Sequence, residues 1–390
     1  MSDSRHTRFI PYGRQDISEA DIEAVVEVLR SDLVTQGPVV PRFEQAVADY
    51  CGAGHGVATS SATAALHVAC AALDLGPGDW LWTSPNTFVA SANAARYCGA
   101  RVDFVDIDPR TYNMSADALA EKLTVAEKEG KLPKIVMPVH FAGQSCDMAA
   151  IHAFSERYGF RIIEDASHAI GGRYQDEPVG NCRYSDVAVF SFHPVKIITT
   201  GEGGMAVTNN AELAGRMGRL RSHGITRDPA LMADDPDGPW DYEQIELGFH
   251  YRMTDIQAAL GLSQMQRLDE FITKRRAIAA HYDEHLAPLP VTTPYQHPKQ
   301  QSAYHLYPIQ VRDAATRREV FQSLRDAGIG VNVHYIPVHT QPDYQQFGFG
   351  WDDYPQGEAF YRRAISLPMF PRLSGGEQQR VIAEIGRVLA

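Results

Sequence analysis

One of the seven lysines lies in a setting that could make it chemically reactive. Lys196 follows an apolar run in the segment FSFHPVKIITTGEGG, whereas the other lysines lie among charged, Gln or turn residues. Burial disfavours the ammonium form and lowers the pKa of a lysine, which is what a Schiff-base lysine needs. The alternative is a lysine at a strand end that extends its ammonium to solvent. The neighbouring motifs decide between the two.

Two carboxylates end an apolar run upstream of that lysine. The segment RIIEDASH places Glu164 and Asp165 directly after three strand-like residues. An acid at the carboxyl end of a parallel strand points into the crevice where α/β proteins bind ligands. The same acid could instead cap a helix or ligate a metal. An aspartate that holds a pyridinium nitrogen is the recurrent partner of a pyridoxal-phosphate (PLP) lysine.

Small hydroxyl residues and one aromatic residue complete this set. The segment HGVATSSATAAL passes from an apolar run into an Ala-rich helical one through Ser60, Ser61 and Thr63. Exposed N–H groups at such a helix start suit a phosphate, although any capped helix has a similar sequence. Phe88 in PNTF follows another apolar run, where its ring could cover a cofactor or pack in the core. A phosphate cradle, a ring, an acid and a lysine in that order indicate a PLP site far more specifically than any one of them.

The elements that must position these residues can be read from the hydrophobic pattern. Short apolar runs rich in Val and Ile alternate with helical patterns and end in polar, Gly or Pro residues, as buried parallel strands do. Segments such as 64–73 and 148–158 fit crossover helices. We therefore predict an α/β layer with a mostly parallel sheet, its strands at 55–59, 80–83, 102–105, 135–140, 161–164 and 187–192.

The two ends of the chain carry further predicted elements. Capping boxes at Ser18 and Thr254 predict a helix over 18–29 and a long helix that runs toward His285. A smaller α+β unit follows, with strands over 305–311 and 330–335, a helix over 316–327 and a closing helix from 375. We expect a large domain over residues 1–260 with an N-terminal arm, and a small C-terminal domain over 261–390. The acidic stretch 228–240 is predicted to be a mobile loop.

The amino-acid composition is that of an ordinary globular protein. Its 390 residues, 44% hydrophobic and 22% charged, provide for roughly two domains. The formal net charge of −12 argues against nucleic acid as a general partner. No apolar run suits a membrane span, and the N-terminal residues lack the apolar core of a signal peptide. Five scattered cysteines favour neither a disulfide framework nor a zinc site, so we expect a reduced, cytoplasmic protein without a metal.

Eight segments together resemble a known family. They are TQGP, SSATAAL, PNTFVASAN, PVHFAG, IIEDASHA, FSFHPVK, TTGEGG and YRMTDIQAALG, and they resemble the DegT-type sugar aminotransferases. Those are PLP enzymes of the aspartate aminotransferase fold (fold type I), and the likeness runs from about Ile10 to the end. The segments SAT, HPVKIITT, GLSQ and VHYIPVH look most like the UDP-4-amino-4,6-dideoxy-N-acetyl-β-L-altrosamine transaminases of pseudaminic acid biosynthesis.

The resemblance implies a role for each matching position. Lys196 would carry the internal aldimine and shuttle a proton, and Asp165 would pair with the pyridine nitrogen. Phe88 would stack on the cofactor ring, and His168 would lie against the ring or its O3′ side. The residues implied to hold the phosphate are Ser61, Ala62, Thr63 and Ser191, and those implied to contact a nucleotide sugar are Tyr12, Thr35, Gln36, Gly37, Pro38, Tyr335, Ile336, Pro337 and Val338.

The resemblance also implies a homodimer with active sites at the subunit interface. The family usually has Gly before the Thr of the phosphate segment, whereas this chain has Ala62, as the subgroup does. It also usually has Asn where this chain has His250, a position that reaches the phosphate of the partner subunit. An imidazole N–H can still donate to a phosphate. The diphosphate charge of a substrate could be offset by Arg221, His223 or Arg227.

The implied activity is transfer of an amino group from L-glutamate to C4 of a UDP-4-keto-6-deoxy-N-acetylhexosamine. A D-series UDP-4-ketosugar or a dTDP-ketosugar is the alternative acceptor. Lys196 argues against the dehydratases of this fold family, which have His at that position. GPGDWL at 76–81 lacks the third glycine of a dinucleotide-binding turn, which argues against an NAD-linked oxidoreductase. A non-catalytic PLP-fold protein could lose the lysine or the acid, but this chain keeps both.

Overall fold

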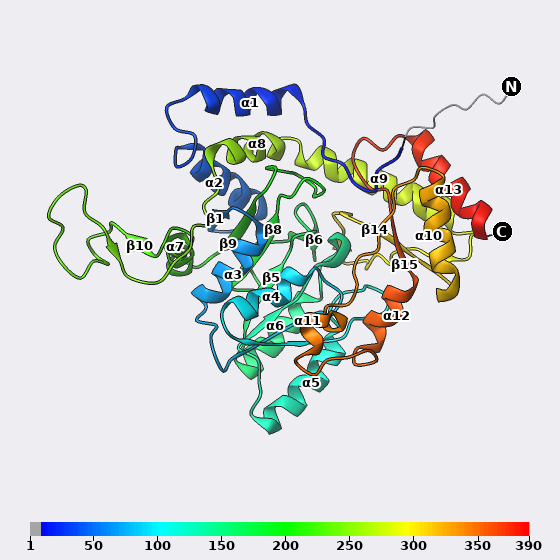
Figure 1. The fold of residues 1–390 in the computed structure, drawn as a ribbon, viewed down its shortest axis with the longest axis horizontal. Coiled ribbons are helices and arrows are strands. Elements are labelled where there is room, and N and C mark those ends of the chain that lie inside the picture. Colours follow the sequence, from blue (N-terminus) through cyan, green and yellow to red (C-terminus); the bar gives the residue numbers. More distant parts are fainter. Residues whose placement is uncertain (1–8, 390) are drawn as a thin grey trace.

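A computed structural model of the chain describes residues 9–389. A seven-stranded sheet forms its centre, in the order β1-β9-β8-β5-β4-β2-β3 (Figure 1). β9 runs antiparallel to both of its neighbours, and the remaining pairs are parallel. The predicted α/β fold with a mostly parallel sheet is confirmed. The strands are β1 (His55–Thr59), β2 (Trp80–Thr83), β3 (Arg101–Phe104), β4 (Ile135–Met137), β5 (Arg161–Asp165), β8 (Val187–Ser191) and β9 (Gly204–Thr208).

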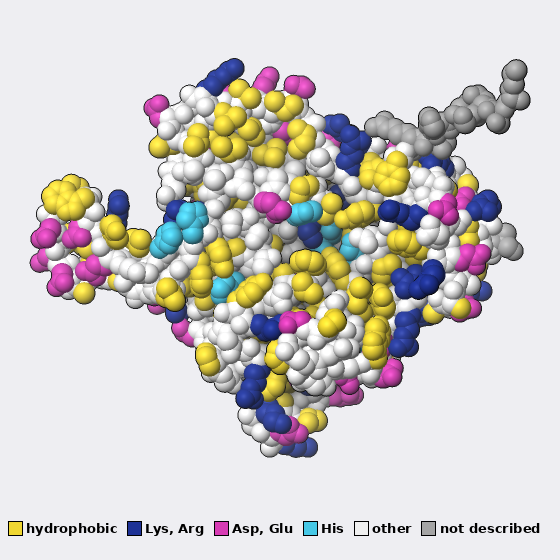
Figure 2. Space-filling view, in the orientation of Figure 1, with side chains coloured by type: hydrophobic (Ala, Val, Ile, Leu, Met, Phe, Trp, Pro, Cys, Tyr) yellow, Lys and Arg dark blue, Asp and Glu magenta, His cyan; other side chains and the backbone are white. Residues whose placement is uncertain are grey.

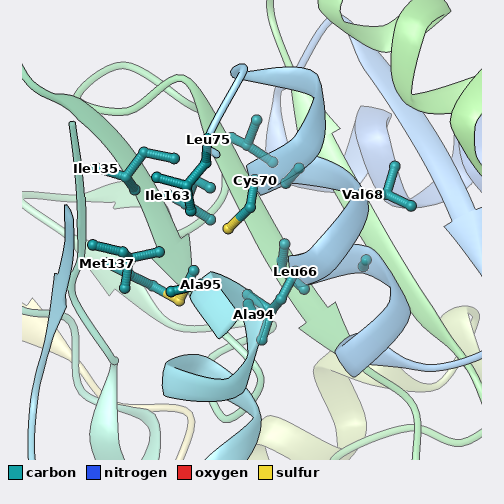
Figure 3. Packing of buried hydrophobic residues seen from close by; sticks show 14 of the residues in the cluster. Leu66, Val68, Cys70, Leu75, Ala94, Ala95, Ile135, Met137 and Ile163 are labelled. Carbon is teal, nitrogen blue, oxygen red and sulfur yellow. The ribbon is translucent and has the colours of Figure 1, made fainter. Parts of the chain in front are cut away.

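Helices cover both faces of this sheet, because alternate residues of each buried strand point to opposite sides. On one face, α3 (Ala62–Ala72), α4 (Val89–Tyr97) and α7 (Ala211–Leu220) belong to one hydrophobic cluster. Figure 3 shows residues of α3 and α4 beside Ile135, Met137 and Ile163 of the sheet. On the other face, α2 (Val39–Cys51) and α8 (Asp255–Met265) cover β1, β9 and β8. There, α5 (Ala116–Glu129) and α6 (Met148–Tyr158) cover the remaining strands. The carboxyl ends of the parallel strands therefore meet at one uncovered edge.

The C-terminal part forms a second layer with its own core. β14 (Tyr307–Val311) pairs antiparallel with β12 (Val291–Thr292) and β15 (Ala364–Leu367). α9 (Leu268–Leu286), α10 (Arg317–Asp326) and α13 (Gly375–Leu389) enclose a separate hydrophobic cluster with this sheet. The short helices α11 (Pro342–Gln345) and α12 (Pro355–Arg363) lie between the two parts (Figure 1). The predicted domain division at residues 260 and 261 falls inside α8 and stays a prediction.

Ile10 and Tyr12, which precede α1 (Glu19–Arg30), are attached to this C-terminal part. Ile10 N–H donates to the carbonyl of Gly328 at 2.9 Å, and Gly330 N–H donates to the carbonyl of Ile10 at 2.6 Å. Met369 N–H donates to the carbonyl of Tyr12 at 2.9 Å. Ile10 and Tyr12 are thus held by backbone hydrogen bonds to segments more than 300 positions later in the sequence.

Two predicted elements were wrong. The single long helix from Thr254 is two helices, because the chain leaves helical geometry at Arg267 (φ −110°, ψ 4°), whose guanidinium contacts Asp16 at 2.9 Å. The predicted strand 330–335 makes only one bridge there, between Asn332 and Ser366, and runs as irregular backbone. β4 ends three residues earlier than predicted because Pro138 has no N–H for the ladder. The sequence analysis also missed β9.

The stretch 228–240 lies in a hairpin that projects from the body of the molecule (Figure 1). β10 (Ile225–Thr226) and β11 (Glu243–Gln244) form its base. The predicted mobility of this loop stays a prediction. The remaining short elements are β6 (Arg173–Tyr174), β7 (Glu177–Pro178) and β13 (Gln300–Gln301), which form a small sheet, and 3-10 turns at Phe141–Gly143, Ala314–Thr316 and Val338–Thr340.

Candidate functional site

The uncovered edge of the sheet opens into a cavity of about 580 Å³. Most residues predicted for the site line it together, although they come from β1 through β8 and from both ends of the chain. They are Tyr12, Ser61, Ala62, Thr63, Phe88, Asp165, His168, Ser191, Lys196 and Tyr335. The structure therefore brings together the lysine, the acid, the ring and the hydroxyl residues of the sequence analysis.

The other predicted residues lie outside this cavity. Thr35, Gln36 and Gly37 line a second cavity of about 210 Å³, together with Arg221 and Arg252, and the two cavities share no lining residue. The remaining five line neither cavity: Pro38, His250, Ile336, Pro337 and Val338. Val338 is fully buried, whereas Ile336 and His250 are exposed.

Lys196 lies on the loop after β8, with its side chain open to the cavity and surrounded by protein. Burial lowers its pKa to about 8, although the charge of Asp165 opposes part of this shift. About a tenth of the amine is therefore neutral at pH 7, compared with less than about a thousandth for an ordinary lysine. This lysine can act as a nucleophile near neutral pH.

The carboxylate of Asp165 is held in the cavity wall by two donors. Its Oδ2 accepts a hydrogen bond from the hydroxyl of Ser91 at 2.6 Å, and its Oδ1 accepts from Ser167 N–H at 3.1 Å. The hydroxyl of Thr87 lies 2.8 Å from that of Ser91. Because the single proton of Ser91 points to Asp165, Thr87 must donate to Ser91. The fully buried Ser91 was not predicted, since it is one small residue within an Ala-rich helix.

The neighbouring acid, Glu164, points to the opposite side of β5. Its carboxylate lies 2.6 Å from His140 Nε2, and it accepts from the hydroxyl of Ser185 at 2.5 Å. Because successive side chains of a strand alternate, only one of the two acids can face the cavity. The geometry selects Asp165.

The start of α3 forms part of the cavity wall. Ser61 is the N-cap and accepts from Ala64 N–H at 3.1 Å. The first N–H groups of a helix have no partner within it, so those of Ala62 and Thr63 suit an anion. β9 passes so close that a Cβ at Gly204 would overlap Ser61 and Ala62. This glycine therefore sets the position of the helix start.

Aromatic and imidazole rings form the other side of the cavity. His168 Nε2 lies 3.1 Å from the Tyr335 hydroxyl, and His168 Nδ1 accepts from Ala142 N–H at 3.3 Å. Burial lowers the pKa of His168 well below its usual value, with a further contribution from the charge of Lys196. His168 is thus neutral with its proton on Nε2. Phe88, 58% exposed, stands at the rim with its ring 6.1 Å from that of Tyr335.

The second cavity carries a cation that the sequence analysis did not select. Arg221 forms an ion pair with Glu44 and donates to the carbonyl of Ala58 at 2.6 Å, so its charge is already compensated. Arg252 has no acidic partner among residues 9–389, and its Nη2 lies 2.9 Å from His250 Nε2. The YRMT segment that begins with Tyr251 was the signal that could have identified this arginine.

Comparison with known proteins agrees with the fold. The profile of the DegT/DnrJ/EryC1/StrS aminotransferase family matches residues 15–386. The spore coat polysaccharide biosynthesis protein SpsC of Bacillus subtilis is 39% identical over 387 residues, 98% of this chain and 97% of that protein. The UDP-4-amino-4,6-dideoxy-N-acetyl-beta-L-altrosamine transaminase of Campylobacter jejuni is 37% identical over 362 residues, 92% of each chain.

Solved structures agree. Helicobacter pylori PseC, an aminotransferase involved in the biosynthesis of pseudoaminic acid, superposes with a TM-score of 0.90 at 30% identity, covering 98% of this chain and 99% of that one. A Streptococcus pneumoniae protein assigned to the sugar aminotransferases, in its PLP form, gives a TM-score of 0.88 at 30% identity, covering 97% and 98%. Among residues 9–389, no helix combines the length and apolar character needed to cross a membrane.

Proposed function

Since the chain belongs to the DegT/DnrJ/EryC1/StrS aminotransferase family, and is thus a PLP-dependent sugar aminotransferase, we propose that it aminates a UDP-linked sugar. The acceptor is a UDP-4-keto-6-deoxy-N-acetylhexosamine of the L-altro series, aminated at C4, and L-glutamate is the donor. The observation that carries this proposal is the cavity in which Lys196, Asp165 and the start of α3 converge. The sugar itself is inferred from the Campylobacter and Helicobacter relatives.

The residues of the cavity fit PLP. The first N–H groups of α3, with Ser61, Thr63 and Ser191, would hold the phosphate, and Phe88 would cover the ring. Asp165 would hold the pyridine nitrogen protonated, because Ser91 and Ser167 keep its carboxylate in place. When bound, the cofactor accepts an amino group from an amino acid and passes it to a keto group.

Lys196 is the residue that carries out the proton transfers. Its lowered pKa lets the amine accept and return a proton near neutral pH, between C4′ of the cofactor and C4 of the sugar. The neutral His168 and the Tyr335 hydroxyl fix the wall beside it through their 3.1 Å contact. In this contact His168 Nε2–H donates to the Tyr335 oxygen. Burial raises the pKa of Tyr335, with the charge of Asp165 adding to the effect, so the hydroxyl keeps its own proton throughout the working pH range.

A substrate panel tests the acceptor. We expect the highest kcat/KM for the L-altro UDP-4-ketosugar, measured against the D-series UDP epimer and one dTDP-ketosugar, with products identified by NMR. The D- and L-series ketosugars differ in the configuration at C5, which carries the 6-methyl group, and a hydrophobic pocket that distinguishes such a group discriminates by about 10–200-fold. A clear preference for either competitor would show that the proposed acceptor is wrong. The proposal that the enzyme transfers an amino group to a sugar would remain.

We also propose that the active unit is a homodimer with shared active sites. Figure 2 shows hydrophobic side chains gathered over α1. Ile22 and Leu29 of α1 are exposed, and so are Leu33 and Val34, which follow it. The projecting hairpin carries Trp240, whose side chain is exposed, between β10 and β11. The second cavity and His250 lie outside the Lys196 cavity of the same chain. In a dimer, His250 and Arg252 of one subunit can supply donors to the phosphate groups in the other.

Subunit mixing tests this arrangement. Lys196→Ala and His250→Ala subunits should each be inactive, and mixing them should restore up to about a quarter of wild-type activity, because one site in each mixed dimer has both residues. A mixture of Lys196→Ala and Asp165→Asn subunits is the control and should stay inactive, since both residues lie in one cavity of one chain. An unimpaired His250→Ala enzyme, or no recovery despite confirmed subunit exchange, would argue against the shared site.

A further inference from the structure

The described lining of the Lys196 cavity contains no arginine, the side chain that most often binds a carboxylate. Among the described residues that line it, the ionisable side chains besides tyrosine are one lysine, two acids and four histidines: Lys196, Asp165, Glu202, His168, His193, His305 and His334. No arginine among residues 9–389 takes part in that lining. An amino acid that donates its nitrogen nevertheless brings an α-carboxylate one carbon away from the reacting bond, and that charge needs a partner.

Among the residues that line the cavity, His305 has a ring nitrogen without a hydrogen-bond partner. It precedes β14, is 4% exposed, and its Nδ1 is buried without a hydrogen-bond partner. Its ring centroid lies 4.4 Å from that of His168. Burial lowers the pKa of His305 well below its usual value, and the charge of Lys196 adds to this effect. A buried polar group without a partner requires an explanation, and a neutral imidazole supplies one N–H donor.

A buried cation stands directly behind His305. Arg275 of α9 is 0% exposed, and its Nη1 donates to the carbonyls of Tyr304 (3.1 Å), His305 (3.3 Å) and Met369 (3.0 Å). Its Nε and Nη2 are buried without partners, and no carboxylate in residues 9–389 pairs with it. Burial lowers its pKa to about 9, so the guanidinium remains charged at neutral pH. An uncompensated charge of this kind is costly unless an anion comes close.

We propose that the His305 end of the cavity is the subsite for the α-carboxylate of the amino donor. The ring N–H of His305 donates to a carboxylate oxygen, and Arg275 compensates the charge through the protein without touching the ligand. A diphosphate does not suit this place, because the sugar ring separates it from the reacting C4, whereas the α-carboxylate is attached to the reacting carbon. This inference rests on the proposed function and adds the place where the donor is recognised.

The test uses the PLP-loaded enzyme and glutarate, a dicarboxylate that has no amino group to transfer. Its Kd is measured by calorimetry on wild-type, His305→Phe and His305→Asn proteins. We expect roughly tenfold weaker binding in His305→Phe, which loses the N–H donor, and a smaller loss in His305→Asn, which keeps one. His281→Phe is the matched control, since His281 also has a buried, unpartnered Nε2 but lies on α9 outside the cavity. It should bind glutarate as wild type does.

The two half-reactions provide the second readout. With glutamate alone, His305→Phe should show a raised KM, while the aminated enzyme should react with the ketosugar at an unchanged KM. An unchanged glutarate Kd in both His305 variants would overturn the proposal, and so would an equal loss in His281→Phe. If Arg252→Gln removes glutarate binding while His305→Phe keeps it, the carboxylate is held by that arginine instead. A wild-type enzyme that accepts nitrogen from no amino acid would instead refute the proposed function.

Discussion

Replacing Lys196 by alanine is expected to abolish turnover and the visible absorbance of the lysine-bound cofactor, while the fold persists. No other amine lines the cavity in the described part of the chain, so nothing replaces it as nucleophile or proton carrier. Absorbance spectra and steady-state assays of Lys196→Ala measure the effect. Near-normal activity of Lys196→Ala would show that Lys196 is not the lysine that binds the cofactor.

Lys122 provides the matched control. Burial lowers its pKa as well, but its ammonium pairs with Asp103 at 2.7 Å, remote from the cavity. Lys122→Ala should therefore keep the absorbance band. Borohydride reduction of the holoenzyme should label Lys196 alone among the seven lysines. The rate at which the cofactor-free protein captures PLP should rise with pH and level off above about 8, because only the neutral amine attacks.

Asp165→Asn is expected to keep PLP bound while lowering kcat by about 10²–10³-fold, the scale for losing one preorganised electrostatic partner. A neutral amide cannot hold the pyridinium proton, although it can keep the contact with Ser91. Spectra show cofactor occupancy, and single-turnover rates show the chemical step.

The control for this substitution is Glu164→Gln. Glu164 lies one residue earlier on β5, is also buried, and contacts His140 and Ser185 on the far side of the strand. Its replacement should cost stability, since it disrupts a buried polar network, but should leave kcat within a few-fold of wild type. A wild-type kcat in Asp165→Asn would make Asp165 a structural acid.

The residues at strand ends could be predicted because their position follows from topology alone. Parallel strands end at the same edge, so polar residues directly after apolar runs must meet there, as Ser61, Asp165 and Lys196 do. The order of these motifs then sufficed to recognise the family. The separation of Thr35–Gly37 into a second cavity could not be foreseen, because it depends on how α2 packs against α8.

Other site residues gain their importance only from tertiary contacts. Arg275 lies in the helical segment TKRRAIAA, where a charge usually indicates a solvent-exposed face, yet the structure buries it against three carbonyls. His305 was predicted as the first residue of a strand, and nothing local marks its unpaired Nδ1. The break between α8 and α9 is equally invisible, because the apolar pattern continues through Arg267.

The attachment of the N-terminal arm imposes an order on biosynthesis. A ribosome makes Ile10 and Tyr12 long before it makes their hydrogen-bond partners Gly328, Gly330 and Met369. The seven-stranded sheet can assemble during translation, since domains generally fold as units from the N-terminus. The cavity wall that contains Tyr12 cannot close until Met369 has been made. A nascent chain that stalls before Gly328 is therefore left with an unattached arm and an unfinished pocket.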